Sequence, residues 1–256
     1  MIKKNISMGK RNVRCERFAF LRKVWDMILQ LLFPLRCPIC DDIVAPAGER
    51  ICATCFEKLQ PITAPFCGKC GRKLLTESCF CRDCKERLHV FTQGRILYQY
   101  EAVSDAIYRF KYGGRKEYGV FFGQQMAEQL GDYVRMIAPQ VIIPIPLHHA
   151  RQKMRGYNQA RVLAEEIGRR LGIPVETKLV KRIKNTNPLK WENPGQRENN
   201  LKKAFIISEN DVKLRRVLLI DDIYTTGRTM DAVAGVCKMA GIQEIYCLSL
   251  TGGSSM

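Results

Sequence analysis

The sequence lacks a long apolar run. The apolar segment at residues 27–35 is nine residues long, whereas a helix needs about 20 apolar residues to cross a bilayer. The charged segment before it, residues 1–18, has no apolar core of the kind found in a cleavable export signal. These two absences exclude a transmembrane segment here and predict a cytoplasmic protein.

Acidic residues are scarce relative to basic ones. The chain has 25 Asp and Glu against 42 Lys and Arg, for a formal net charge of +17. Residues 1–36 carry nine basic and two acidic side chains, and residues 151–203 carry fourteen and five. This surplus favours a polyanionic partner, such as nucleic acid, a phosphorylated substrate or an anionic membrane. A generally basic soluble protein is the alternative.

Histidine is also scarce, with three residues, whereas cysteine is abundant, with twelve. A two-residue spacer lets both thiolates of a tight turn face one ion, and two such turns complete a tetrahedral Cys₄ site. Without an export signal, this spacing favours metal over disulfides. We expect one or two structural zinc ions, with a redox disulfide pair or an iron–sulfur cluster as alternatives. The candidate ligands form four Cys-x-x-Cys pairs: Cys37, Cys40, Cys52, Cys55, Cys67, Cys70, Cys81 and Cys84.

The grouping of these pairs is open at this point. Sequential pairing joins the first two pairs around one ion and the last two around another, and a cross-braced pairing also satisfies the spacing. Cys79 competes with Cys81, which has the better spacing to Cys84. Neither group includes histidine or an open position, so the sites are expected to be structural. A segment as short as residues 37–88 needs the metal to fold.

Residues 217–240 predict a phosphate-binding strand, loop and helix. Four apolar residues, Val217 to Ile220, precede the acid pair Asp221 and Asp222. The turn that follows offers backbone N–H groups, threonine hydroxyls and a helix start, all of which favour a phosphate. The carboxylates repel phosphate and suit the neutral diol of a ribose. This is not a Walker loop, because no lysine follows the glycine. The alternative to a phosphate site is that the acid pair caps the start of the helix and the turn is an ordinary solvated turn. The turn contains Thr225, Thr226, Gly227, Arg228 and Thr229.

Beyond the cysteines, strand and helix patterns alternate. This predicts an α/β fold with a mostly parallel, doubly wound sheet and a ligand at the carboxyl ends of its strands. The expected strands are residues 96–100, 141–144, 205–207, 217–220 and 245–250, and the expected helices are residues 102–110, 121–137, 158–171 and 230–240. The expected divisions are a basic extension (1–36), a double zinc-ribbon module (37–88) and the α/β domain (89–256).

Two other segments have distinctive patterns. Residues 18–33 predict a basic amphipathic helix that packs on the zinc module, with a membrane-surface or partner-binding helix as the alternative. Residues 184–200 have no apolar periodicity and contain two prolines, one glycine and five asparagines. Such a loop is typical of a lid or a disordered segment, and a lid suits a reaction that must exclude water.

The order of motifs resembles the ComF family. The resemblance covers about residues 30–250, and Thr186 departs from it, because Leu189 stands where the family has glutamine. It is carried by the cysteine pairs, Phe110-Lys111-Tyr112, Pro144-Ile145-Pro146-Leu147, Arg155-Gly156-Tyr157-Asn158-Gln159-Ala160, Arg197-x-x-Asn200-x-x-x-Ala204-Phe205 and the segment 217–229. It implies a double zinc ribbon joined to a type I phosphoribosyltransferase domain, in a bacterial cytosolic protein that acts on incoming single-stranded DNA.

The resemblance also implies a ligand and partners. The ligand is phosphoribosyl pyrophosphate with Mg²⁺, its 5-phosphate on residues 225–229 and its ribose on Asp221 and Asp222. The loop of Pro144, Ile145, Pro146 and Leu147 would approach the pyrophosphate. Lys111 and Arg155 are candidate catalytic residues, with Arg151 and Asn158 as further donors. Expected partners are single-stranded DNA, a DNA-uptake helicase or other competence proteins, and the inner face of the membrane as a peripheral contact.

Overall fold

The computed structural model describes residues 32–46, 48–184, 204–207 and 213–253, together with Trp25 and Ile28. Most of the expected amphipathic helix, and the expected lid apart from Lys184, lie outside the described residues. Trp25, Ile28 and Leu32 are helical and exposed. Within the described part of the chain, no helix combines the length and apolarity that a membrane crossing requires.

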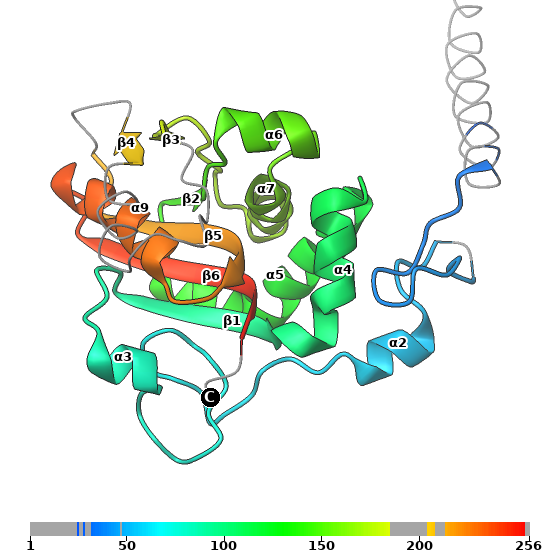
Figure 1. Ribbon diagram of the computed structural model, residues 1–256, viewed down its shortest axis with the longest axis horizontal. Coiled ribbons are helices and arrows are strands. Elements are labelled where there is room, and N and C mark those ends of the chain that lie inside the picture. The colour runs from blue at the N-terminus through cyan, green and yellow to red at the C-terminus, as the bar shows by residue number, and fades with distance from the viewer. Residues whose placement is uncertain are drawn as a thin grey trace, which may run out of the picture.

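A four-stranded parallel sheet forms the centre of the molecule (Figure 1). Its strands, in spatial order, are β1 (Gln93–Gln99), β6 (Glu244–Gly252), β5 (Arg216–Tyr224) and β2 (Val141–Pro144). The expected parallel sheet is therefore confirmed. β5 continues four residues beyond the expected end at Ile220, because Asp221 and Tyr224 still pair with Ser249 and Gly252 of β6. The acid pair thus belongs to a strand held by its neighbour.

Helices cover both faces of the sheet. Alternate residues of β5 point to opposite faces, so the strand contributes to two hydrophobic clusters. Leu218 and Ile220 join one hydrophobic cluster with α4, α5 and α7, and Val217 and Leu219 join another with α9. The four helices correspond to the four expected from the sequence, with ends shifted by up to four residues. They are α4 (Tyr100–Tyr112), α5 (Glu117–Ile137), α7 (Gln159–Leu171) and α9 (Arg228–Met239).

Two features of the α/β domain differ from the sequence-based expectation. β4 (Phe205–Ile207) lies outside the central sheet and pairs antiparallel with β3 (Val180–Arg182). A helix, α6 (His149–Arg155), lies between the loop of residues 144–148 and α7, where the sequence predicts no element. The His148 ring accepts a hydrogen bond from the Ala150 N–H at 3.3 Å, and Gly156 ends the helix with φ +77°. A histidine cap is a weak signal, which explains why so short a helix escapes prediction.

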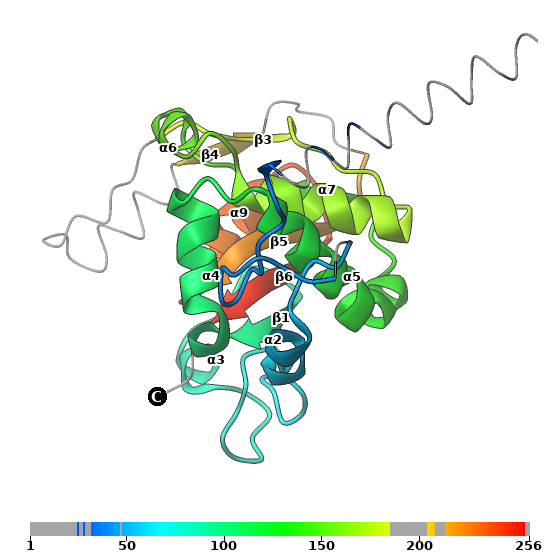
Figure 2. The same cartoon turned by 90° about the vertical axis from the view of Figure 1, so that its right-hand side faces the viewer.

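The two cysteine modules share one plan. In each, the first Cys-x-x-Cys pair lies on a turn closed by an antiparallel bridge, and the second pair begins beside a short helix. These helices are α2 (Ala53–Lys58) and α3 (Arg82–Glu86). Figure 2 shows the same arrangement from the side, with α2 and α3 at the same end of the molecule as β1. We call the modules the first ribbon (residues 35–59) and the second ribbon (residues 65–87).

The ribbons dock on different parts of the α/β domain. In the first ribbon, the Ile39 carbonyl accepts a hydrogen bond from Arg109 of α4 at 2.6 Å. In the second, the Lys69 carbonyl accepts one from the Gly94 N–H of β1 at 2.7 Å. At Gly71, an added Cβ would lie 2.5 Å from the Arg95 Cα, so the turn requires glycine. The second ribbon is therefore pressed against the edge of the sheet.

Candidate functional site

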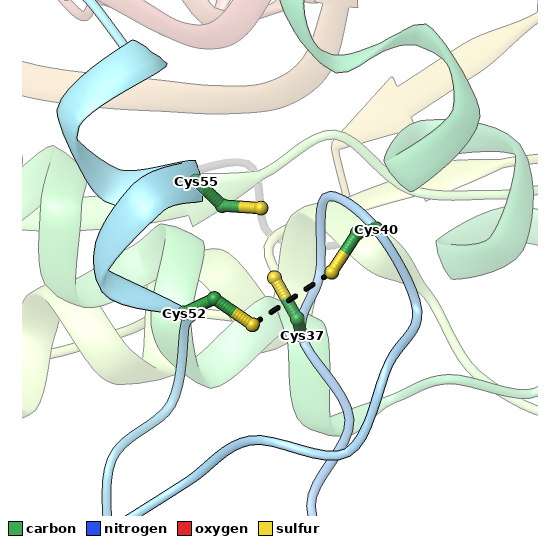
Figure 3. Close-up of side chains that lie close together, drawn as sticks. All are labelled: Cys37, Cys40, Cys52 and Cys55. Atoms are coloured by element: carbon green, nitrogen blue, oxygen red, sulfur yellow. Dashed lines mark hydrogen bonds between the residues drawn. The ribbon is translucent and has the colours of Figure 1, made fainter.

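The eight paired cysteines form two clusters with sequential grouping. In each, the four sulfurs lie within 4.8 Å of one another (Figure 3 shows the first cluster). The Cys40 and Cys52 sulfurs are 3.7 Å apart, and those of Cys70 and Cys81 are 3.8 Å apart. A tetrahedral zinc ion with bonds of about 2.3 Å places its sulfurs about 3.8 Å apart. The donor set therefore fits zinc, and Cys79 lies outside the second cluster and is exposed.

Each cluster holds one thiol in a setting that favours the thiolate. Burial disfavours the charged form of Cys37, but backbone N–H groups of Cys40, Cys52 and Ile39 lower its pKa to about 7. In the second cluster, the thiols of Cys70 and Cys84 hold the pKa of Cys67 well below its usual range. Metal binding requires thiolates, and each cluster therefore offers at least one thiol whose surroundings favour that form.

The turn after β5 leaves a helix start open to an anion. α9 begins at Arg228, and its N-cap residue, Gly227, provides no side-chain cap. Gly227 precedes it with φ +74°, a left-handed conformation that favours glycine. An added Cβ there would lie 2.5 Å from the Tyr224 hydroxyl and 2.8 Å from the His89 Cε1. Gly227 thus allows a tight turn between β5 and α9, and Thr225 and Thr226 are exposed beside it.

A lysine from a different element reaches the acid pair. Lys111, in the last turn of α4, places its Nζ 3.1 Å from Asp222 Oδ1. The Asp222 N–H donates to Asp221 Oδ1 at 2.8 Å. Burial raises the pKa of Asp221 to about 7, the charge of Asp222 acts in the same direction, and Lys111 opposes both. The site thus combines two carboxylates and one ammonium group beside the open helix start.

Arg182 of β3 is a further cation at this site that sequence reasoning missed. Its pKa is lowered first by burial and then by the charge of Arg151, while Asp221 raises it. Its guanidinium lies over the Phe205 ring of β4 at 5.3 Å. The small β3–β4 sheet therefore brings an arginine toward the acid pair. A three-residue strand carries too weak a pattern to predict this placement.

The loop of Pro144, Ile145, Pro146 and Leu147 lies beside the acid pair, because β2 pairs with β5 up to Pro144 and Ile220. The Ile145 N–H donates to the Ile220 carbonyl at 2.9 Å. Asn158, which caps α7, donates its side-chain amide to the Ile145 carbonyl at 2.9 Å. Asn158 is thus a support of this loop in the structure.

Arg155 lies against an aromatic ring. It donates to the Tyr112 hydroxyl and to Gln159 Oε1, both at 3.1 Å, and its guanidinium lies 5.0 Å from the Tyr112 ring centre. Tyr157 packs on Phe110 with ring centres 5.7 Å apart and donates to the Phe110 carbonyl. Tyr157 therefore packs against α4 in this structure.

Comparison with known proteins identifies the family. Models of a double zinc ribbon domain and a phosphoribosyl transferase domain match residues 28–85 and 157–255. Competence protein F of Haemophilus influenzae is 32% identical over 228 residues, which cover 85% of this chain and 97% of that protein. The chain belongs to the competence protein F, or ComF, family. Competence protein ComFC of Bacillus subtilis is 31% identical over 197 residues, 73% of this chain and 77% of that protein. DNA utilization protein YhgH of Escherichia coli is 24% identical, covering 86% and 99%.

The second ribbon of this ComF chain touches the phosphate-binding turn. Arg72, which is buried, donates to the Thr225 carbonyl, pairs with Asp83 at 2.9 Å and lies over the Tyr224 ring at 5.8 Å. No local motif marks Arg72 as part of this site, because it lies 153 residues from Thr225.

The segment that links the second ribbon to the sheet also reaches the turn. His89 Nδ1 lies 2.7 Å from Asp231 Oδ2 in the first turn of α9, and the Val90 N–H donates to Asp231 Oδ1 at 2.8 Å. The His89 ring stacks on Phe91 at 4.8 Å. The phosphate-binding turn and the start of α9 are thus held by Arg72 of the second ribbon and by the linker residues His89 and Val90. The sequence alone does not assign either part of the ComF chain to the site.

The raised pKa of Asp221 gives a prediction about pH. Below about pH 7 the ligand-free protein holds a proton on Asp221, and a ligand that needs the carboxylate must displace it. We expect the affinity for magnesium phosphoribosyl pyrophosphate to rise between about pH 6 and 8, with proton release on binding. Calorimetry in buffers of different ionisation enthalpy measures the released proton. Asp221→Asn corrects for ionisation of the ligand itself, and an equal proton release in that variant would contradict the assignment.

Proposed function

We propose that this ComF chain binds phosphoribosyl pyrophosphate with Mg²⁺ and acts as a phosphoribosyltransferase-like protein in DNA uptake during natural transformation. The supporting observation is the ion pair between Lys111 and Asp222, at 3.1 Å, directly before the uncapped start of α9. A strand end, an acid pair and an open helix start in this order suit a ribose 5-phosphate better than any other common anion. Phosphate meets backbone N–H groups, and the diol meets carboxylates.

Transfer would replace pyrophosphate at the anomeric carbon by a nucleophile, through an oxocarbenium-like transition state. The chain need not supply a covalent nucleophile; it holds the ribose, stabilises the leaving group and excludes water. Residues 225–229 would bind the 5-phosphate, Asp221 and Asp222 the ribose hydroxyls, and residues 144–147 would approach the pyrophosphate. Lys111 would favour the ionised form of the acid pair, and Arg155 would reach the leaving group by turning from Tyr112. When bound, Mg²⁺ would supply positive charge on the pyrophosphate.

The two cysteine clusters would each hold one structural zinc ion, because all four donors of each are thiols and none is left for a reacting ligand. The names of the relatives, competence protein and DNA utilization protein, support a role in DNA handling. We infer that the partners are single-stranded DNA and a DNA-uptake helicase or other competence proteins. The place of action would be the cytoplasm, with peripheral contact at the inner membrane face.

The test is a calorimetric titration of the zinc-loaded protein with phosphoribosyl pyrophosphate and Mg²⁺, beside an Asp221→Asn/Asp222→Asn variant. We expect micromolar binding by the wild type and a loss of at least about a hundredfold in the variant, because two charged acceptors of the ribose are lost (about 1.4 kcal/mol per tenfold). No binding by a folded wild-type protein would refute the proposal.

A second candidate function is a non-catalytic sensor of phosphoribosyl pyrophosphate or a nucleotide that holds single-stranded DNA. The surplus of basic residues favours it, since a small ligand needs far less positive charge than +17. Pyrophosphate release in the presence of nucleobases separates the two functions. Release supports a transferase, and salt-sensitive DNA binding without release supports the sensor.

A further inference from the structure

Two tyrosines stand exposed on the outer side of α4, next to the candidate site. Tyr108 and Tyr112 are 66% and 55% exposed, and their ring centres lie 5.3 Å apart, one helical turn from each other. The helix buries its other side through Val103, Ile107 and Phe110. The two rings therefore contribute little to the core, and a neighbouring pair of exposed rings is an unusual use of large side chains.

The surroundings of this pair are basic. α6 contains three basic residues and no acidic residue, and residues 109–116 contain four basic residues, of which Lys111 is paired with Asp222 and Arg115 with Asp41 and Glu117. The positive charge around the two tyrosines therefore comes mainly from α6. α6 lies beside the C-terminal end of α4 (Figures 1 and 2), where Arg155 lies over the Tyr112 ring at 5.0 Å. We call Tyr108, Tyr112 and Arg155 the aromatic platform.

The platform is continuous with the candidate site through one helix. Lys111 precedes Tyr112 in the same turn but points inward, to Asp222 at 3.1 Å. Acidic residues lie on the side of Tyr108 toward the start of α4, at Glu101 and at Asp105, which is one turn before Tyr108. A bound polyanion would therefore extend from the tyrosines toward α6 and away from the start of α4.

Stacked aromatic and guanidinium planes in a positive setting match single-stranded nucleic acid. Each base has a face that stacks on a ring, and the neighbouring lysines and arginines neutralise the backbone. A duplex does not fit this platform, because its base faces are already stacked on each other. An acidic protein surface would use the charges but not the two ring faces.

We propose that the aromatic platform holds single-stranded DNA by stacking bases on Tyr108 and Tyr112, so that the strand passes the mouth of the phosphoribosyl pyrophosphate site. This assigns the principal DNA contact to α4 and α6 instead of the zinc ribbons. This proposal rests on the proposed function, because it places a DNA strand next to the phosphoribosyl pyrophosphate site.

The experiment measures the binding of a fluorescent oligothymidylate to the full-length, zinc-loaded chain by anisotropy over a range of salt concentrations. For Tyr108→Ala/Tyr112→Ala we expect at least tenfold weaker binding with an unchanged salt slope, because stacking releases no counterions. For Lys153→Ala, in α6, we expect a shallower slope, by about 0.7. The matched control is Phe80→Ala, which removes a ring 45% exposed on the second ribbon and should bind as the wild type does.

Several outcomes would overturn the platform: wild-type affinity in the double tyrosine variant, an equal loss in Phe80→Ala, equal affinity for a duplex of matching sequence, or no binding by the wild type. Tyr108→Trp/Tyr112→Trp should restore binding, which a general loss of structure would not allow. Calorimetry with phosphoribosyl pyrophosphate on Tyr108→Ala keeps the two proposals apart. If the wild type binds DNA through the tyrosines but not phosphoribosyl pyrophosphate, the proposed function fails and the platform remains.

Discussion

Exchange of Cys67 for serine is expected to abolish binding of phosphoribosyl pyrophosphate, although Cys67 belongs to the second ribbon and not to the phosphate-binding turn. Cys67 is buried in the same hydrophobic cluster as Leu219 of β5 and Val233 of α9. A structural zinc site contributes about 10–16 kcal/mol of apparent binding free energy, which rivals the total stability of a domain. Loss of one thiolate should therefore unfold the second ribbon and withdraw Arg72 from the Thr225 carbonyl. We expect the melting temperature to fall by at least about 10 °C.

Cys37→Ser is the matched control for this prediction. It removes the corresponding ligand of the first cluster, which docks on α4 through Arg109 and lies away from the turn. It should also release one zinc ion, with a much smaller loss of ligand affinity. Arg72→Ala should retain both zinc ions and still weaken the ligand about tenfold, since one buried hydrogen bond by a charged donor is removed. Metal analysis, thermal melting and calorimetry on the three variants give the answer, and equal losses of affinity in both cysteine variants would contradict a specific link.

Replacement of Gly227 by alanine should reduce the affinity for phosphoribosyl pyrophosphate by at least about a hundredfold. The left-handed conformation costs a non-glycine residue about 1–2 kcal/mol, and the added methyl group would meet Tyr224 and His89. Those two rings cannot give way easily, because His89 is stacked on Phe91 and bound to Asp231. The turn must therefore change shape, and its N–H groups would no longer point at one phosphate.

Gly235→Ala provides the control within the same helix. No atom lies within 4 Å of an added Cβ at that position, so the variant should be more stable by about 0.5–1 kcal/mol and should bind the ligand normally. Calorimetry and chemical denaturation of the two variants test the pair. Normal affinity in Gly227→Ala would show that the turn does not form the phosphate site.

The sequence predicts most of the fold because local patterns carry it. The apolar run at residues 217–220 and the alternating elements are enough to predict the parallel sheet and its helices, and the Cys-x-x-Cys spacing is enough to predict two four-cysteine groups. Spacing alone does not decide which turns meet, so the sequential grouping of the cysteines is visible only in the structure. Arg72, His89 and Arg182 were missed because each joins the site through contacts between distant parts of the chain. β3 and α6 are too short to carry a clear period.

The expected boundary near residue 88, between the zinc-ribbon module and the α/β domain, does not separate two hydrophobic cores. Cys67, Cys70 and Cys81 belong to the same buried cluster as Phe91, Ile96 and the inner side of α9. The ribbon therefore fills a place that a covering helix would otherwise occupy, and the division in sequence is not a division in packing. A fragment that begins at residue 89 would retain the sheet and every residue of the phosphate turn, yet it would expose part of its own core to water. Occupancy of the second cysteine cluster should therefore report whether this part of the core is covered.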